Sequence, residues 1–215
     1  MRFSDLLGRS LHDLRNPLSV VRASLEWLEM DLTEREEIID AVRDASTATT
    51  RILTILEDLD MLARLESGAE LPRGVVDVGA TLERVAAATH AQLLPSGVAV
   101  VVLRAPPMHV PGDVRLVERA LEALVDVCGR AGPLASCVEI DAHVVDVESD
   151  SGAVEITIGL RGTVAIEGRL ASIDALGNGG IDVYLALRAI EEHGGSLVVR
   201  RTQTVPQTIV RLPLA

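Results

Sequence analysis

The N-terminal part of the chain carries an apolar repeat whose spacings alternate between three and four residues. Such a repeat places its side chains along one stripe of an α-helix, as in coiled coils and helical bundles. Thr33 and Glu36 form a capping-box pattern that predicts the start of a second helix, and Ser67 and Gly68 predict its end. The repeat comprises Leu7, Leu11, Leu14, Leu18, Val21, Leu25 and Leu28, followed by Val42, Ala45, Thr49, Ile52, Leu56, Leu59 and Ala63.

Two such helices joined by a short turn predict an antiparallel hairpin with one apolar stripe on each arm. A lone hairpin cannot cover these stripes, so we expect two copies to pair into a four-helix bundle. The pattern therefore predicts a homodimer formed through residues 1–66. The alternative is that the stripes pack on the rest of the same chain.

From about Asp77 onward, short helical and strand patterns are mixed along the chain. This order predicts a layered α/β sandwich. We therefore expect an α+β protein with a hairpin domain over residues 1–70 and a second domain over residues 71–215. The expected helices are 80–94, 115–127 and 181–192, and the expected strands are 97–103, 137–145, 154–158, 196–200 and 208–212.

The charge and the cysteine content argue against several classes of function. The formal net charge of -12 argues against binding nucleic acid through its phosphates. Cys128 and Cys137 fit neither a disulfide framework nor a zinc spacing, so we expect a reducing compartment and no metal site. No apolar run is long enough to span a bilayer, and the start lacks the apolar core of a signal peptide. We therefore expect a cytoplasmic protein with no membrane partner.

The seven-residue string from His12 to Leu18 carries the most informative chemistry. Because the neighbouring leucines face the apolar stripe, His12 lies at its flank and Asn16 lies one turn further on the same side. Asp13 can orient the imidazole or accept its proton, which leaves a ring nitrogen free as a nucleophile. Asn16 can position a water or a phosphoryl group beside that nitrogen.

This string resembles the H-box of the dimerisation and phosphoacceptor domain of bacterial sensor histidine kinases. The resemblance implies that His12 carries a phosphoryl group, that Asp13 assists, and that Asn16 serves phosphatase chemistry. It extends along the chain, since residues 113–116 lead into a helix that resembles the N-box and residues 193–197 resemble the helix exit of the kinase ATP-binding fold. The second domain is therefore expected to resemble that fold.

The boxes that hold ATP in this family are altered here. Asp126 takes the place of the magnesium-binding asparagine, and Glu122 replaces the usual asparagine one turn earlier. Leu160 stands where an aspartate accepts the adenine amino group, and leaving that group unpaired costs about 1–3 kcal/mol. Asp182 replaces the third glycine of the phosphate-binding pattern. The altered nucleotide site would also involve Gly162 and Gly180.

An intact phosphoacceptor string beside an altered nucleotide site predicts that kinase activity has been lost. The pattern is similar to the ChpT-like histidine phosphotransferases, which implies transfer of a phosphoryl group between receiver-domain aspartates through His12. The implied partners are response-regulator receiver domains, with a hybrid sensor kinase as a further candidate. We expect no cofactor of its own, because the receiver would supply magnesium. Two alternatives stay open: an ATP-dependent histidine kinase with a divergent nucleotide site, and a non-catalytic pseudokinase that binds a response regulator.

Overall fold

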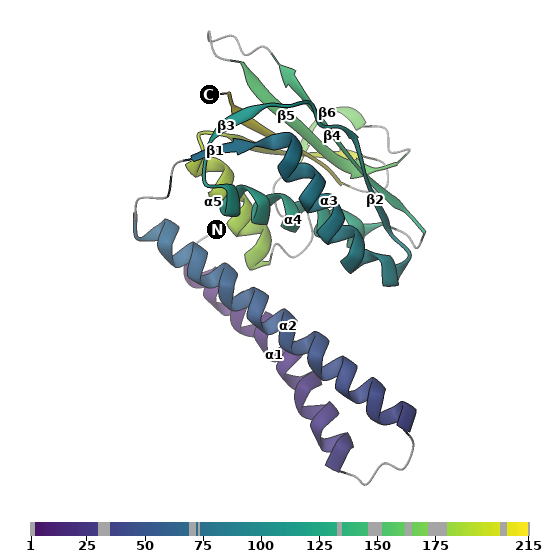
Figure 1. Cartoon of the computed structure of the whole chain (residues 1–215). Coiled ribbons are helices and arrows are strands. Elements are labelled where there is room, and N and C mark those ends of the chain that lie inside the picture. Colours follow the sequence, from purple (N-terminus) through teal and green to yellow (C-terminus); the bar gives the residue numbers. More distant parts are fainter. Residues whose placement is uncertain are drawn as a thin grey trace. The chain divides into compact units, whose positions relative to one another are not determined.

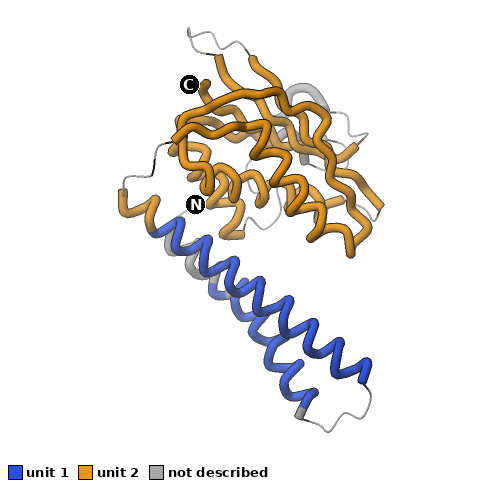
Figure 2. The backbone as a smooth tube through the Cα atoms, viewed as in Figure 1, with its two compact units in different colours: residues 1–63 blue, residues 64–215 orange. Residues whose placement is uncertain are grey.

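The computed structural model describes residues 3–29, 35–68, 72, 74–132, 135–145, 152–161, 165–171, 180–202 and 206–214. The chain divides into two compact units, residues 1–63 and residues 64–215 (Figure 2). The positions at which the second helix was predicted to be capped include Thr33, which lies outside the described residues.

The first unit is a pair of long helices. Helix α1 spans Phe3–Glu29 and helix α2 spans Arg35–Glu66 (Figure 1). Glu36 and Glu37 lie in the first turn of α2 and Arg64 lies in its last turn, an arrangement that complements the helix dipole. The predicted helical hairpin is confirmed.

In the described residues, the second unit contains three longer helices, a 3₁₀ turn and eight strands. Its elements in chain order are β1 (Gly74–Asp77), α3 (Val78–Leu93), the 3₁₀ turn η1 (Leu94–Ser96), β2 (Ala99–Arg104), β3 (His109–Gly112), α4 (Val114–Ala131), β4 (Cys137–Val145), β5 (Ala153–Leu160), β6 (Ala165–Ala171), α5 (Ile181–Glu192), β7 (Ser196–Thr202) and β8 (Pro206–Pro213).

Six of these strands form one sheet in the order β2-β4-β5-β8-β7-β6, and β1 pairs with β3 in a separate two-stranded sheet. The β2–β4 pair is parallel, and the other pairs of the large sheet are antiparallel. Helices α3, α4 and α5 cover one face of the large sheet (Figure 1). Alternate residues of β4 (Val138, Ile140 and Ala142) are fully buried, as expected for a strand with one covered face.

Aspartate side chains set the start of two of the covering helices. Asp77 accepts a hydrogen bond from the N–H of Ala80 at the start of α3. Asp113 accepts hydrogen bonds from the N–H groups of Arg115 and Leu116 at the start of α4. These contacts satisfy backbone donors that the helix itself leaves unpaired.

The α+β class and the order of hairpin and sandwich are confirmed, and several element boundaries differ from the prediction. Helix α4 extends to Ala131, and β5 extends to Leu160. Strands β1, β3 and β6 were not predicted. The first two are four residues long and pair with each other across more than thirty residues, so neither shows a local strand pattern.

Candidate functional site

The predicted phosphoacceptor segment lies within α1. His12 belongs to this helix, although its side chain lies outside the described part of the structure. Asp13 is half-buried and Asn16, one turn beyond residue 12, is exposed. Pro17 lies inside the helix and is buried, and it offers no N–H to the carbonyl four residues earlier. Asn16 is therefore placed where its amide can meet a partner molecule.

The hairpin separates the predicted apolar stripe of α1 into two rows. Leu14, Val21 and Leu28 are half-buried, whereas the other row stays largely in water. Leu11, Leu18 and Leu25 form that second row, with 59%, 53% and 52% of their surface exposed. The alternating repeat fills both rows, because successive members lie on either side of one helical stripe. Only one row can face α2.

On α2 the residues that are buried differ from those predicted for the apolar stripe. The fully buried row consists of Ala41, Ala48, Ile55 and Leu62, spaced seven residues apart, and none of them was predicted. Val42 and Leu56, which were predicted to face the stripe, are 53% and 48% exposed. Residues 42, 49 and 56 form a row that lies next to the row of residues 41, 48 and 55 on the helix surface. Because alanine is small and only weakly apolar, Ala41 and Ala48 did not mark the second row as the buried one. Each arm of the hairpin thus presents an uncovered apolar row.

The two acids predicted for a magnesium site lie on α4, and both are engaged by arginines. Both carboxylate oxygens of Asp126 accept from Nε of Arg130, at 2.9 and 2.8 Å. Glu122 forms an ion pair with Arg119, with 3.6 Å between Oε2 and Nη1. A hard cation needs oxygen ligands whose charge is available to it. The neighbouring guanidinium groups of the same helix reduce the negative charge that these carboxylates offer to a magnesium ion.

Leu160 occupies the position predicted for the adenine-binding acid, and it is part of the core. It is 6% exposed and lies at the end of β5. A Cβ added to Gly132 would lie 2.8 Å from its Cδ1, so the leucine packs directly on the backbone that follows α4. The hydrocarbon side chain offers no acceptor for an adenine amino group. This position therefore lacks the acceptor that the resemblance to the kinase fold implies for adenine.

The glycine-rich segment before α5 is described from Gly180 onward, and Gly162 lies outside the described residues. Gly180 is the N-cap of α5. Asp182 lies in the first turn, is 8% exposed, and its Oδ1 accepts from the N–H of Val183 at 3.0 Å. The structure thus brings Glu122 and Asp126 onto one helix, while the described residues place Leu160 and Asp182 at the ends of other elements.

His193 has a contact that its sequence position did not suggest. Its Nδ1 lies 2.6 Å from the carbonyl oxygen of Ala189, and its Nε2 accepts from the N–H of Asp113 at 2.9 Å. The ring therefore joins the end of α5 to the start of α4. A Cβ on Gly112 would overlap this ring, so only glycine fits there. The His-Gly-Gly sequence signalled a helix end, but nothing local points to a partner eighty residues away.

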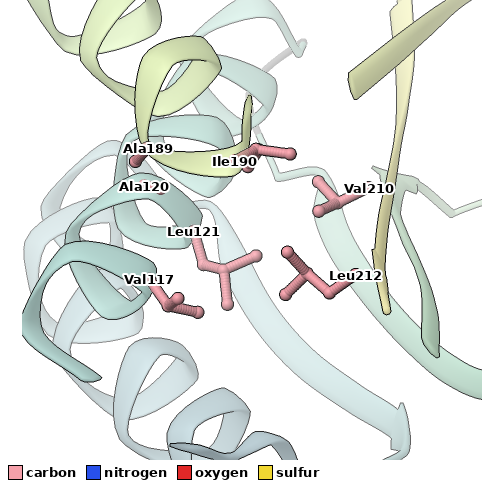
Figure 3. A pocket seen from close by; sticks show the side chains of 7 residues that line it. All are labelled: Val117, Ala120, Leu121, Ala189, Ile190, Val210 and Leu212. Carbon is pink, nitrogen blue, oxygen red and sulfur yellow. The ribbon is translucent and has the colours of Figure 1, made fainter. Parts of the chain in front are cut away.

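A narrow apolar gap lies between α4, α5 and β8 (Figure 3). Leu121 of α4 and Leu212 of β8 point toward one another across it. The gap is too narrow for a water molecule and has an almost wholly apolar lining, so it is a packing imperfection without ligand-binding chemistry. Its lining comprises Val117, Ala120, Leu121, Ala189, Ile190, Val210 and Leu212.

Two kinds of feature are absent from the described part of the chain. No helix there is long and apolar enough to cross a membrane. The described His, Cys, Asp and Glu side chains include no group of three that could hold a metal ion.

Comparison with known proteins shows which proteins this chain resembles. Residues 4–68 match the His Kinase A (phospho-acceptor) domain. Over 211 residues the chain is 27% identical to the probable sensor histidine kinase TcrY of Mycobacterium tuberculosis, covering 94% of this chain and 44% of TcrY. Its fold is similar to that of the Acinetobacter baumannii histidine kinase AdeS, with a TM-score of 0.65 at 20% identity over 94% of this chain and 98% of that one. The chain thus contains a segment that matches the phospho-acceptor domain, and it shares the fold of this histidine kinase structure.

A further histidine kinase structure shows the same fold with a partner. ThkA, solved in complex with the response regulator protein TrrA, matches 98% of this chain and 61% of its own with a TM-score of 0.65 and 15% identity. The hairpin corresponds to the phospho-acceptor domain of histidine kinases, and the sandwich to their ATP-binding fold. The chain spans less than half the length of TcrY.

Proposed function

We propose that this chain is a dimeric histidine phosphotransferase that passes a phosphoryl group between receiver-domain aspartates through His12. One observation carries the proposal. A segment that matches the phospho-acceptor domain is joined to a histidine kinase-like fold in which a buried leucine, Leu160, stands at the predicted adenine position. The acids of α4, paired with Arg119 and Arg130, support the same reading.

The chemistry requires a nucleophilic imidazole that a partner can reach. A nitrogen of the neutral ring would attack the phosphorus of an aspartyl phosphate, forming an N–P bond as the P–O bond to the carboxylate breaks. The ring proton would then pass to a carboxylate, for which Asp13 is the candidate, or to water. Transfer to a second receiver reverses these steps. Positioning supplies most of the rate enhancement, so the chain needs no nucleotide for this reaction.

Dimerisation is part of the proposal, because each hairpin arm carries an uncovered apolar row. Leu11, Leu18 and Leu25 on α1, with Val42 and Leu56 on α2, are each about half exposed. Pairing two hairpins along these rows would remove them from water and give a four-helix bundle. The partner is proposed to be a response-regulator receiver, as in the complex of ThkA with TrrA.

The second candidate is an ATP-dependent histidine kinase with a divergent nucleotide site. The specific observation in its favour is that TcrY and AdeS are both named as histidine kinases. The third reading, a pseudokinase that only binds a response regulator, predicts that His12 is dispensable.

Two labelling experiments and one binding and signalling assay separate the three readings. With radiolabelled ATP and magnesium we expect no label on the wild type, and label on the wild type but not on His12→Ala would establish the kinase reading instead. With a labelled phosphorylated receiver we expect label to move to the wild type and to His109→Ala, a matched change of an exposed histidine elsewhere. If His12→Ala binds the receiver and supports signalling as the wild type does, the protein is a binding module.

A further inference from the structure

The N-terminus of α5 carries a negative charge supplied by the chain itself. Asp182 is only 8% exposed, and its Oδ1 accepts from the N–H of Val183 at 3.0 Å. The N-cap, Gly180, has no side-chain acceptor to offer. The first N–H groups of a helix are unpaired and lie at the positive end of its dipole, so this end attracts anions. Asp182 therefore places a carboxylate in the first turn of α5, at the end of the helix that attracts anions.

The other two covering helices are capped in a different way. Asp77 and Asp113 precede α3 and α4 and bind amide groups from outside the helix. Asp77 is exposed and Asp113 is half-buried, whereas Asp182 lies inside the first turn and is buried. A buried carboxylate costs free energy unless charge or hydrogen bonds compensate it. The amide of Val183 and the dipole of α5 contribute to that compensation.

We propose that Asp182 is a resident anion that excludes phosphate-bearing ligands from the N-terminus of α5. This inference rests on the proposed function, because it gives a reason why the second unit would work without a nucleotide. A phosphate approaching this helix end would meet a like charge that is buried and therefore poorly screened by salt. It would also compete with a carboxylate that never dissociates from the chain.

The test is thermal unfolding of the full chain with and without sodium tripolyphosphate. In Asp182→Asn, which keeps the shape of the side chain and removes its charge, we expect tripolyphosphate to raise the Tm. At roughly ten times the dissociation constant the ligand stabilises the fold by about 1.4 kcal/mol, so the rise in Tm should be roughly 3–6 °C. The wild type should show no rise. Glu192→Gln is the matched control, because it removes one negative charge from the exposed C-terminal end of the same helix and should leave the anion without effect.

Amide hydrogen exchange tests the same inference at the helix itself. In Asp182→Ala the N–H of Val183 loses its acceptor, and we expect faster exchange there that tripolyphosphate slows again. The inference is overturned if the wild type gains as much Tm as Asp182→Asn, or if tripolyphosphate changes neither the Tm nor the exchange in either variant. Those outcomes leave receiver-to-His12 transfer intact, whereas ATP labelling of the wild type would remove the proposed function.

Discussion

Leu18→Asp should weaken the proposed dimer, and the exposure of Leu18 sets the scale of the effect. Leu18 is 53% exposed in the isolated chain, so a dimer interface has about half of its surface left to bury. Complete burial of a leucine side chain contributes about 1.5–3 kcal/mol to the free energy of association. Burial of the exposed half of Leu18 therefore contributes about 1 kcal/mol per protomer. Each dimer contains the residue twice, so the loss is about 2 kcal/mol, or roughly thirtyfold in Kd. Burying an unpaired carboxylate adds to this cost.

The measurement is sedimentation equilibrium over a range of concentrations. Val20→Asp is the matched control, because it makes the same change two residues further on, where the helix presents a different face. Val20 is 44% exposed, so both variants start from a similar surface. We expect a Kd at least about thirtyfold weaker for Leu18→Asp and near the wild-type value for Val20→Asp. Equal dimerisation of both variants, or a wild type that is monomeric up to its solubility limit, would refute the reasoning.

Three further predictions concern the second unit. Gly112→Ala should lower the Tm by several degrees, because the added Cβ would overlap the ring of His193. Gly74→Ala, on the strand that pairs with β3, should change the Tm little. Equal Tm values for the two variants would contradict this packing. Burial raises the pKa of the Cys128 thiol to about 11. At pH 8 a thiol reagent should therefore modify only the other cysteine of the native protein, and Cys128 should react once denaturant is added. Modification of both cysteines in the native protein would contradict this prediction. The hydrogen bond from Arg104 on β2 lowers the pKa of Asp141. The resulting stabilisation of the fold is present above the ordinary carboxyl pKa and disappears as the pH falls through the lowered pKa. Asp141→Asn should therefore lower the Tm by roughly one or two degrees at neutral pH and leave it unchanged at low pH.

The sequence predicted those features that depend on local pattern. The three longer helices of the sandwich and most strands of its sheet follow from periodicity and turn residues. Helix α5 spans residues 181–192 as expected, because Gly180 and His193-Gly194 mark its ends. The resemblance of the His12 string to the phosphoacceptor box agrees with the matched range of 4–68.

Features that depend on distant partners were not predictable in the same way. Strands β1 and β3 exist only because they pair with each other. The buried row of α2 was missed, since alanines at 41 and 48 are weakly apolar and the neighbouring Val42 and Leu56 are more hydrophobic. Pairing of Asp126 with Arg130 follows from a helical spacing of four residues and could have been inferred from sequence alone. The contact between His193 and Asp113 could not.

The order of strands in the large sheet constrains how the second unit folds. Strand β8 is the last strand of the chain, yet it lies between β5 and β7 and is the only link between β2-β4-β5 and β7-β6 in the described sheet. Until residues 206–213 arrive, two partial sheets expose unpaired edges to each other and to other molecules. The two helices of the first unit, by contrast, form through hydrogen bonds between residues four positions apart, and such local contacts should form rapidly. During synthesis the helical arms would therefore be structured well before the sandwich can close, and the sandwich is the part of the nascent chain most in need of protection from aggregation.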